Sequence, residues 1–307
     1  MTELGFKNIS DFHSYNGMPE PENPLFSASH IAVNQDSTES CDHTNKEVSL
    51  TCDFYVISLK NIISGELIYG RTQYDCTNGT LLFTAPNQKL IFKGLVFSSD
   101  AYHVAFHKDF LRGTELQQRI KKYNFFEYNV HEALHLSPKE EALLKSIFKI
   151  IEAEYQKNQD EFSKEIILSQ LETLLEYSDR FYKRQFLHRK EINQSLLSKF
   201  TQVLNTYFEE GDLLNKGIPT VDWMAGKLKV SHRYMSDMIK AETGKTAVDQ
   251  INLFLIEEAK NLLLAPHTSI SETAYQLGFE YPQYFSRLFK KKTGMSPKEY
   301  IQSESLN

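Results

Sequence analysis

The segment "GFEYPQYFSRLFKKKTGMSP", Gly278–Pro297, joins aromatic residues to a run of cations near the end of a 307-residue chain. Gly278 allows the backbone to turn where a side chain would clash, and Pro282 suits the first turn of a helix. Phe285 and Phe289 then recur at helical spacing, so they predict a helix that packs its aromatic residues inward. The polar residues and the lysines of this helix are left on the outside.

A second copy of this pattern lies about 50 residues earlier in the chain. The segment "MAGKLKVSHRYMSDMIKAETGKTAVDQI", Met224–Ile251, aligns with Thr273–Ile301 and places Gly244 on Gly294. Each copy is interpreted as a short helix, a tight connection and a second helix, and Ser231 is a suitable N-cap for the second helix of the first copy. The repeat therefore predicts two helix-turn-helix motifs.

The second helix of each copy keeps a polar face outside, because the spacing i, i+3, i+4, i+7 follows one side of a helix. In the major groove of DNA, arginine suits guanine, glutamine suits adenine, and a carboxylate accepts a hydrogen bond from cytosine. Lysines further along suit the phosphates beside the groove. We therefore predict base reading by Arg233, Ser236, Asp237, Gln283, Ser286 and Arg287, and phosphate contacts by Lys240, Lys290, Lys291 and Lys292.

A solvated charged face would be the simpler interpretation of a single such helix. Two copies that present side chains at the same offsets favour double-stranded DNA as the partner.

Residues 270–300 resemble the signature of the AraC family of bacterial transcription regulators. That motif contains an alanine, a Gly-Phe pair, a Phe-x-Arg-x-Phe-Lys core, a glycine and a Ser-Pro pair. The matching residues are Ala274, Gly278, Phe279, Phe285, Arg287, Phe289, Lys290, Gly294, Ser296, Pro297 and Tyr300. The sequence departs from the family at Leu255 and Ile301, where arginine is common, and at the acidic Asp237. The resemblance covers about the last 100 residues and implies a DNA-binding domain, activation of transcription, and RNA polymerase as a further partner. The basic segment Arg180–Lys190 and the helices expected after it place the start of this domain near residue 188, so it is expected over residues 188–307.

The first half of the chain has a strand pattern. Short apolar or alternating runs between Phe54 and Phe106 are separated by turn signals, which predicts an antiparallel β-barrel or sandwich. Residues 1–50 predict mostly loop with a few edge strands. Members of the AraC family commonly carry a cupin-like β-barrel sensor in this place, and the pattern is similar. The expected fold class is thus α+β: a cupin-like barrel with helices, then an all-α domain.

Two helices are predicted between this barrel and the C-terminal domain. Ser137 and Glu140 have the spacing of a capping box for the first, and the second is expected from about residue 164 to 182. Its apolar stripe would pack on the barrel or on a second copy of the chain. We therefore predict a homodimer, with residues 1–187 as the sensor and dimerisation region.

Aromatic residues of the predicted barrel would either line a pocket for a small-molecule effector or form its core. The pocket candidates are Tyr55, Tyr69, Tyr74, Phe83 and Phe92. His103 and His107 raise the alternative of a cupin-type metal-dependent enzyme or metal sensor that carries a DNA-binding tail. Four residues along one strand separate these histidines by roughly 13 Å, too far for one ion, so no metal, cofactor or enzymatic activity is predicted.

Composition limits the remaining possibilities. With 41% apolar residues the chain can bury a sizeable core, and its net charge of −6 requires any DNA-binding surface to be local. The cysteines Cys41, Cys52 and Cys76 lack the spacing of a disulfide framework or zinc site, so we expect plain thiols. Neither a membrane span nor a signal peptide is recognisable, and we expect a cytoplasmic protein.

Overall fold

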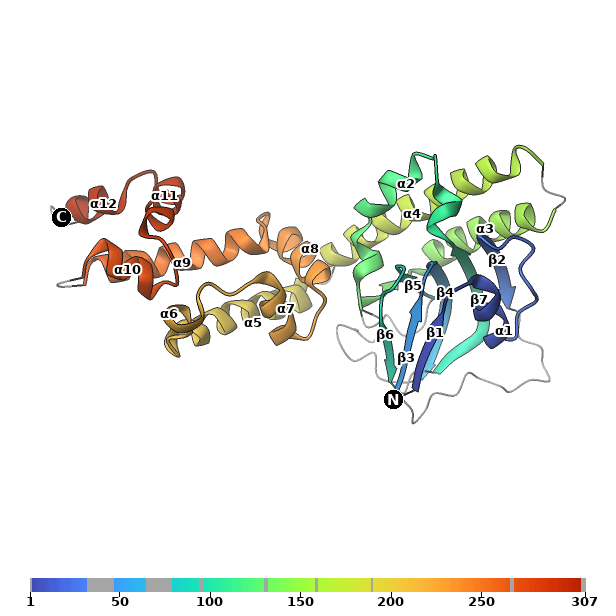
Figure 1. Cartoon of the computed structure of the whole chain (residues 1–307), viewed down its shortest axis with the longest axis horizontal. Coiled ribbons are helices and arrows are strands. Elements are labelled where there is room, and N and C mark those ends of the chain that lie inside the picture. The colour runs from blue at the N-terminus through green and yellow to red at the C-terminus, as the bar shows by residue number, and fades with distance from the viewer. Residues whose placement is uncertain are drawn as a thin grey trace. The chain divides into compact units, whose positions relative to one another are not determined.

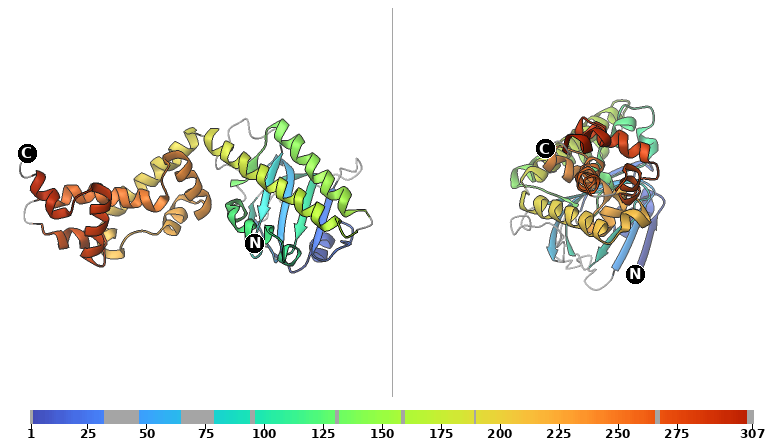
Figure 2. Two further views of the ribbon diagram at one scale, coloured as in Figure 1. Left: turned by 90° about the horizontal axis from the view of Figure 1, so that it is seen from above. Right: turned by 90° about the vertical axis from the view of Figure 1, so that its left-hand side faces the viewer.

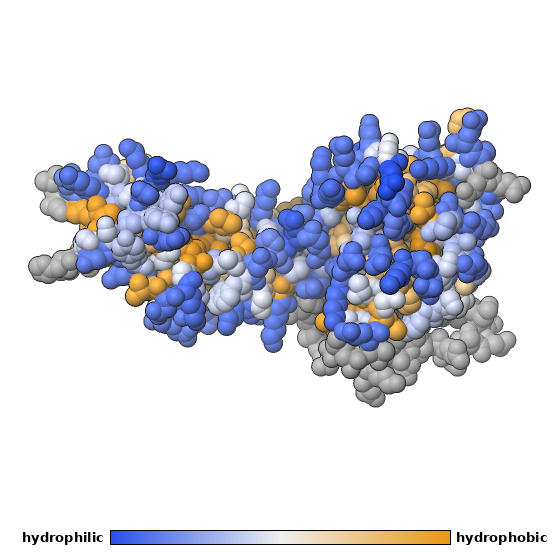
Figure 3. All heavy atoms as spheres, in the orientation of Figure 1, coloured by the Kyte–Doolittle hydropathy of each residue, from blue (hydrophilic) through white to orange (hydrophobic). Residues whose placement is uncertain are grey.

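The computed structural model describes residues 2–31, 47–64, 79–93, 96–129, 132–157, 160–188, 190–265 and 268–304. Its internal contacts divide the chain into two compact units, Met1–His188 and Arg189–Asn307. On the face seen in Figure 3, hydrophilic residues cover most of the described surface of both units, with hydrophobic residues in small groups. Within the described ranges, no helix combines the length and the apolar character that crossing a bilayer needs.

The first unit contains two β-sheets (Figure 1). One sheet has the strand order β1-β3-β6, formed by β1 (Thr2–Phe6), β3 (Glu47–Cys52) and β6 (Leu90–Lys93). The other has the order β2-β7-β4-β5-β8, formed by β2 (Phe26–Ile31), β7 (Val96–Phe106), β4 (Tyr55–Ser64), β5 (Thr80–Thr84) and β8 (Leu134–His135). The α+β class is confirmed, whereas the closure of these sheets into a cupin-like barrel stays a prediction.

One strand pair, which lies before the Phe54–Phe106 segment predicted to be antiparallel, is parallel. β1 and β3 pair in parallel, with Thr2 opposite Val48 and Phe6 opposite Cys52. Parallel neighbours need a crossover connection, and here the chain leaves the sheet through α1 (Ile9–Tyr15) and β2 before it returns as β3. The prediction of mostly loop over residues 1–50 missed this helix.

A hydrophobic core lies between the two sheets and beneath α1. It contains Phe6, Ile9, Phe12, Met18, Cys52, Phe54, Val56 and Ala105, all buried. Because Val56 and Ala105 belong to this core, the side chains two residues away on the same strands, Ser58 and His103, lie on the same face of the larger sheet. Burial raises the pKa of the Cys52 thiol to about 12, so this cysteine is a neutral core residue.

Two long helices cover the opposite face of the larger sheet. Figure 2 shows α3 (Pro138–Tyr155) and α4 (Ser163–His188) side by side across its strands. The predicted capping box is confirmed, since the backbone N–H of Ser137 donates to the Glu140 carboxylate at 2.8 Å and that of Glu140 donates to the Ser137 hydroxyl at 3.4 Å. The apolar stripe of α4 is buried in this unit: Ile167, Leu171, Leu174 and Leu175. It therefore packs as core.

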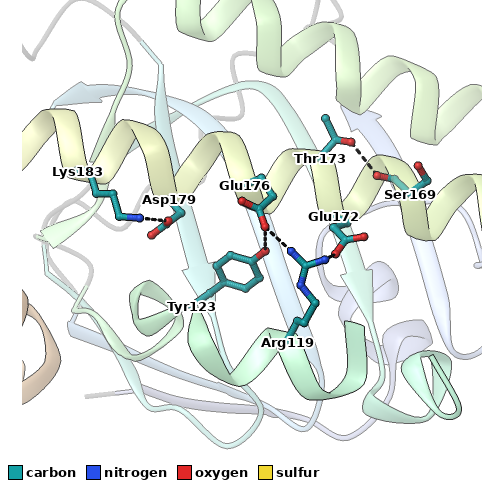
Figure 4. A network of polar contacts seen from close by, with 8 residues as sticks. All are labelled: Arg119, Tyr123, Ser169, Glu172, Thr173, Glu176, Asp179 and Lys183. Carbon is teal, nitrogen blue, oxygen red and sulfur yellow. Dashed lines mark hydrogen bonds and ion pairs between the residues drawn. The ribbon is translucent and has the colours of Figure 1, made fainter. Parts of the chain in front are cut away.

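Short helices lie between β7 and β8. They are η2 (Lys108–Leu111), α2 (Leu116–Arg119), η3 (Ile120–Lys122) and η4 (Asn124–Glu127). A polar network attaches them to α4 (Figure 4): Arg119 donates to Glu172 and, at 2.6 Å, to Glu176, and the Tyr123 hydroxyl donates to Glu176 at 3.0 Å. The carboxylates beside Arg119 raise the pKa of its guanidinium above its ordinary value.

In the described residues of the second unit, the regular secondary structure is entirely helical. Its helices are α5 (Lys190–Glu209), α6 (Asp212–Lys216), α7 (Val221–Leu228), α8 (His232–Thr243), α9 (Ala247–Leu263), α10 (Ile270–Gln276), α11 (Pro282–Thr293) and α12 (Pro297–Glu304). The pairs α7–α8 and α10–α11 are two helix-turn-helix motifs, and α9 connects them (Figure 1). The sequence repeat is thus a structural repeat.

Candidate nucleic-acid interface

The second helix of the first motif, α8, is positioned by its cap and its buried face. The Ser231 hydroxyl accepts a hydrogen bond from the backbone N–H of Tyr234 at 3.2 Å, as the sequence predicted. Its inward residues are Tyr234, Met235, Met238 and Ile239, all buried. This packing leaves the predicted reading and phosphate residues outside: Arg233 and Lys240 are exposed, and Ser236 and Asp237 are half-buried.

The corresponding helix of the second motif, α11, begins with Pro282 in its first turn and buries Phe285 and Phe289 completely. Gln283, Arg287, Lys290 and Lys291 are exposed on its other side. The Ser286 hydroxyl is half-buried and donates a hydrogen bond to the Pro282 carbonyl at 3.1 Å. The hydroxyl proton of Ser286 is therefore engaged within the helix, and its oxygen can still accept a hydrogen bond.

Gly278 sets the turn of the second motif. Its φ of +80° lies in the left-handed region, and a Cβ atom there would lie 2.7 Å from the carbonyl oxygen of Leu213 and 3.0 Å from the backbone of Gly217. The turn thus packs directly against the backbone at α6. Only glycine fits both the backbone angle and this close approach.

One predicted phosphate contact has a partner inside the domain. The Lys292 ammonium lies 2.7 Å from a carboxylate oxygen of Asp249, in the first turn of α9. Hydrogen bonds from Lys292 and from the Thr246 hydroxyl hold the pKa of Asp249 below its usual range. Lys290 and Lys291 carry their charges on the exposed surface instead.

The aromatic residues proposed for an effector pocket lie elsewhere. Tyr55 stacks on Phe106 with ring centroids 5.0 Å apart, and Phe83 lies 5.2 Å from Phe126 of η4. Both pack against Phe126, where Phe83 is a buried core residue and Tyr55 is half-buried. The cavity beside Phe83, at about 10 Å³, has room for about one water molecule. Tyr69, Tyr74 and the side chain of Phe92 lie outside the described residues.

The two histidines of the alternative interpretation are engaged separately. His103 is buried, with its Nδ1 2.9 Å from the Ser58 hydroxyl, and burial lowers its pKa well below the ordinary value. His107 follows β7, and its Nδ1 accepts a hydrogen bond from the backbone N–H of Asp109 at 3.2 Å as the cap of η2. In the part of the chain that the structure describes, no three His, Cys, Asp or Glu side chains are grouped as metal ligands would be.

Comparisons with known proteins agree with this geometry. The sequence profile of a helix-turn-helix domain matches residues 224–303. An uncharacterized HTH-type transcriptional regulator from Pseudoalteromonas carrageenovora is 39% identical over 80 residues, which cover 26% of this chain and 47% of that protein. The chain thus spans about half the length of this relative.

A longer alignment reaches the HTH-type transcriptional activator RhaS of Escherichia coli O6:H1, with 23% identity over 260 residues, 81% of this chain and 86% of that protein. Among solved structures, a transcriptional regulator with an AraC-type DNA-binding domain from Chromobacterium violaceum is 19% identical over 36% of this chain and 91% of that one, with a TM-score of 0.32.

The duplicated motif, its polar outer helices and the profile match define a helix-turn-helix DNA-binding domain. The Phe285–Arg287–Phe289–Lys290 core and the Gly278 turn, placed as described, carry the family signature. Residues 224–303 therefore form a helix-turn-helix domain of the AraC type.

Proposed function

We propose that this chain is a sequence-specific DNA-binding transcription regulator that acts as an activator. The observation that carries the proposal is the pair of recognition helices, α8 and α11, which expose polar side chains at matching offsets from one connecting helix, α9. The names of its relatives, which are transcription regulators, support this function over a metal-dependent enzyme or metal sensor. Such a regulator would work in the cytoplasm.

In this proposal each motif has some residues that contact bases and others that contact phosphates. Arg287 and Gln283 of α11, and Arg233 of α8, would contact base edges, with Ser236, Ser286 and Asp237 beside them. The exposed lysines 240, 290 and 291 would contact phosphates. The two helices would enter major-groove segments about 34 Å apart on one side of the duplex.

Footprinting with residues 188–307 alone tests the proposal. The fragment should protect the same segment of duplex DNA as the full chain, because it contains both motifs and the helix that joins them. A matched variant in which Arg233 and Arg287 are both alanine should lose that footprint but keep weak salt-sensitive binding. A wild-type fragment that leaves DNA unprotected where the full chain protects it would refute the proposed function.

Activation would require contact with RNA polymerase, which the relatives named as activators favour. Transcription in vitro from a template that carries the protected site, with purified polymerase and the full chain, measures it. Stimulation is the expected result, and repression would reverse the assigned sign of regulation.

We further propose that the first unit binds a small-molecule effector between its two sheets. The face of the larger sheet that borders the core between the sheets has a polar centre, where the Ser58 hydroxyl and the His103 ring form a buried hydrogen bond between β4 and β7. The Ser27 hydroxyl of β2 is hydrogen-bonded to His13 of α1 at 2.7 Å nearby in the same core. A polar ligand would find donors and acceptors there.

A screen of metabolites for stabilisation of the full chain against heat tests the effector site. A ligand of this site should raise the unfolding temperature of the wild type, and Ser58→Ala should reduce the rise. The same rise in both proteins would place the ligand elsewhere. Metal analysis of the purified chain separates this proposal from that of a metal sensor.

We propose, finally, that the chain is a homodimer joined through the outer face of α4. The buried stripe of this helix already packs inside its own unit, so a dimer contact would need another surface of the helix. The outer residues from 162 to 187 recur at alternating steps of four and three, which is the spacing of a coiled-coil seam, with apolar residues toward the ends and polar ones in the middle. They are Phe162, Ile166, Ser169, Thr173, Glu176, Arg180, Lys183 and Leu187.

A further inference from the structure

The first turn of α11 carries an exposed aromatic residue that the reading face described above does not include. Tyr284 is the third residue of this helix and is 56% exposed. Tyr281, directly before the helix, is 47% exposed, and the two rings meet edge to face with centroids 5.7 Å apart. A single exposed tyrosine is ordinary, but two that touch form a small apolar surface at the tip of a recognition helix.

Helix geometry places Tyr284 on the reading face. With about 100° of rotation per residue, Tyr284 lies about 60° from Arg287 on the side of Lys291, and Gln283 lies about 40° away on the other side. Residues in the N-terminal part of a recognition helix contact the base edges in the groove. The ring of Tyr284 would therefore enter the major groove beside the polar side chains.

The chemistry of the groove leaves one match for an aromatic ring at this position. Of the four bases, only thymine presents an apolar group in the major groove, its C5 methyl. The contact with Tyr281 limits the directions that the Tyr284 ring can take, so less conformational freedom is lost on binding.

We propose that Tyr284, held by Tyr281, reads a thymine methyl group and makes α11 selective for thymine at one base pair. This inference rests on the proposed DNA-binding function and adds apolar readout to the contacts already proposed for arginine, glutamine, serine, aspartate and lysine. It also explains why the tip of a DNA-facing helix exposes aromatic surface instead of more cations.

The experiment begins with duplex sites selected by the full chain from a random-sequence library. Each thymine of the selected duplex is then replaced, one at a time, by deoxyuridine, which removes only the methyl group and keeps the base pair. At one position we expect about a fourfold loss of affinity, the value for one buried methyl group. Elsewhere in the duplex, thymine and deoxyuridine should bind alike.

Four variants identify the residue responsible. Tyr284→Ala should bind the thymine and deoxyuridine duplexes equally at that position, whereas Tyr284→Phe, which keeps the ring, should preserve the fourfold difference. Arg287→Ala should preserve it as well while relaxing a preference for guanine. Tyr275→Ala is the matched control, because Tyr275 is similarly exposed, at 49%, but belongs to α10.

Four results would each overturn the inference: a deoxyuridine scan with no effect at any position, a selected site without thymine, a thymine preference that persists in Tyr284→Ala, or a loss of affinity in Tyr284→Phe equal to that in Tyr284→Ala. The last would indicate a hydroxyl contact with phosphate. Failure of the DNA-binding function itself is distinct, since the library would then yield no enriched sequence at all.

Discussion

Lys292 and Asp249 form an ion pair, with 2.7 Å between Nζ and Oδ1, that joins the last turn of α11 to the first turn of α9. The neighbouring Lys290 and Lys291 are exposed. Three consecutive lysines that the sequence presents as one run are therefore divided by the fold into two exposed cations and one that holds two helices together.

This division predicts different outcomes for neighbouring substitutions. Lys291→Ala should weaken binding to all DNA sequences alike and lower the salt slope by about one, because one phosphate contact is lost. Lys292→Ala should change the slope less. Asp249→Asn, which releases the Lys292 ammonium, should make the slope steeper. Titrations over a series of salt concentrations measure all three, and identical slopes for the two lysine variants would contradict the division.

Arg287 should behave differently from either lysine. Its planar guanidinium can donate two hydrogen bonds to guanine, so Arg287→Ala should cost about 1–3 kcal/mol on the preferred site and relax selection at one base pair. Binding to a set of single-base variants of the site measures this. If the variant loses affinity uniformly and keeps the base preferences, Arg287 contacts phosphate or serves the fold.

The turn at Gly278 predicts a large effect on stability. Gly278→Ala should lower the free energy of unfolding by about 3 kcal/mol or more, because the left-handed backbone is strained and the added Cβ would overlap the Leu213 carbonyl. Gly294→Ala is the matched control: its φ is +86°, but a Cβ there meets nothing within 4 Å, so only the backbone cost of about 1–2 kcal/mol remains. Urea unfolding of both full-length variants compares them, and equal losses would mean that the close approach is relieved elsewhere.

The C-terminal domain was largely predictable from sequence because its signals are local. Ser231 caps the next helix, Phe285 and Phe289 mark its buried face, and Gly278 marks the turn, each within a few residues of its effect. The pairing of Lys292 with Asp249 was not predictable from sequence. The two residues are 43 positions apart, and their contact depends on how α9 and α11 pack against each other. Tyr284 was missed because exposure is known only once the helix is placed.

The N-terminal unit was harder to predict for the same reason. The sequence does not distinguish aromatic residues that line a pocket from those that form a core, as for Tyr55 and Phe83. The face of the sheet that they occupy is decided by the register of β4 and β5. The parallel pairing of β1 with β3 joins segments more than 40 residues apart, and no local pattern specifies it. The contact between Ser58 and His103 likewise depends on the register of β4 with β7, which places the two residues opposite each other.

The buried His103 predicts a dependence of stability on pH. Burial lowers its pKa in the folded chain, so between that value and its unfolded value of about 6.5 the unfolded state binds a proton that the folded state does not. Stability should therefore fall as the pH drops below about 6.5. Urea midpoints at pH 7.5 and 5.5 measure the loss, which should shrink in His103→Asn. An equal loss in that variant would assign the effect to other groups.

The outer seam of α4 predicts the geometry of the homodimer. Its ends are apolar and exposed, Phe162 by 58% and Leu187 by 64%. Its centre carries Arg180 and Glu176, and the Glu176 carboxylate also accepts hydrogen bonds from Arg119 and Tyr123 of its own chain. A parallel pair would place each charge against its own copy, whereas an antiparallel pair places Glu176 opposite Thr173 and Arg180 opposite Ser169 of the second copy. Because like charges repel, we expect antiparallel pairing, with Phe162 of one copy against Leu187 of the other.

Light scattering of the full chain at micromolar concentration should therefore give the mass of a dimer. Phe162→Glu and Leu187→Glu should each give a monomer, since either change puts a charge into both apolar ends of the antiparallel seam. Ile150→Glu, at a site that is 47% exposed on α3 outside the seam, should leave the dimer intact and serves as the control. A monomeric mass for the wild type would refute the dimer proposal. If both seam variants remain dimeric, the interface lies on another surface.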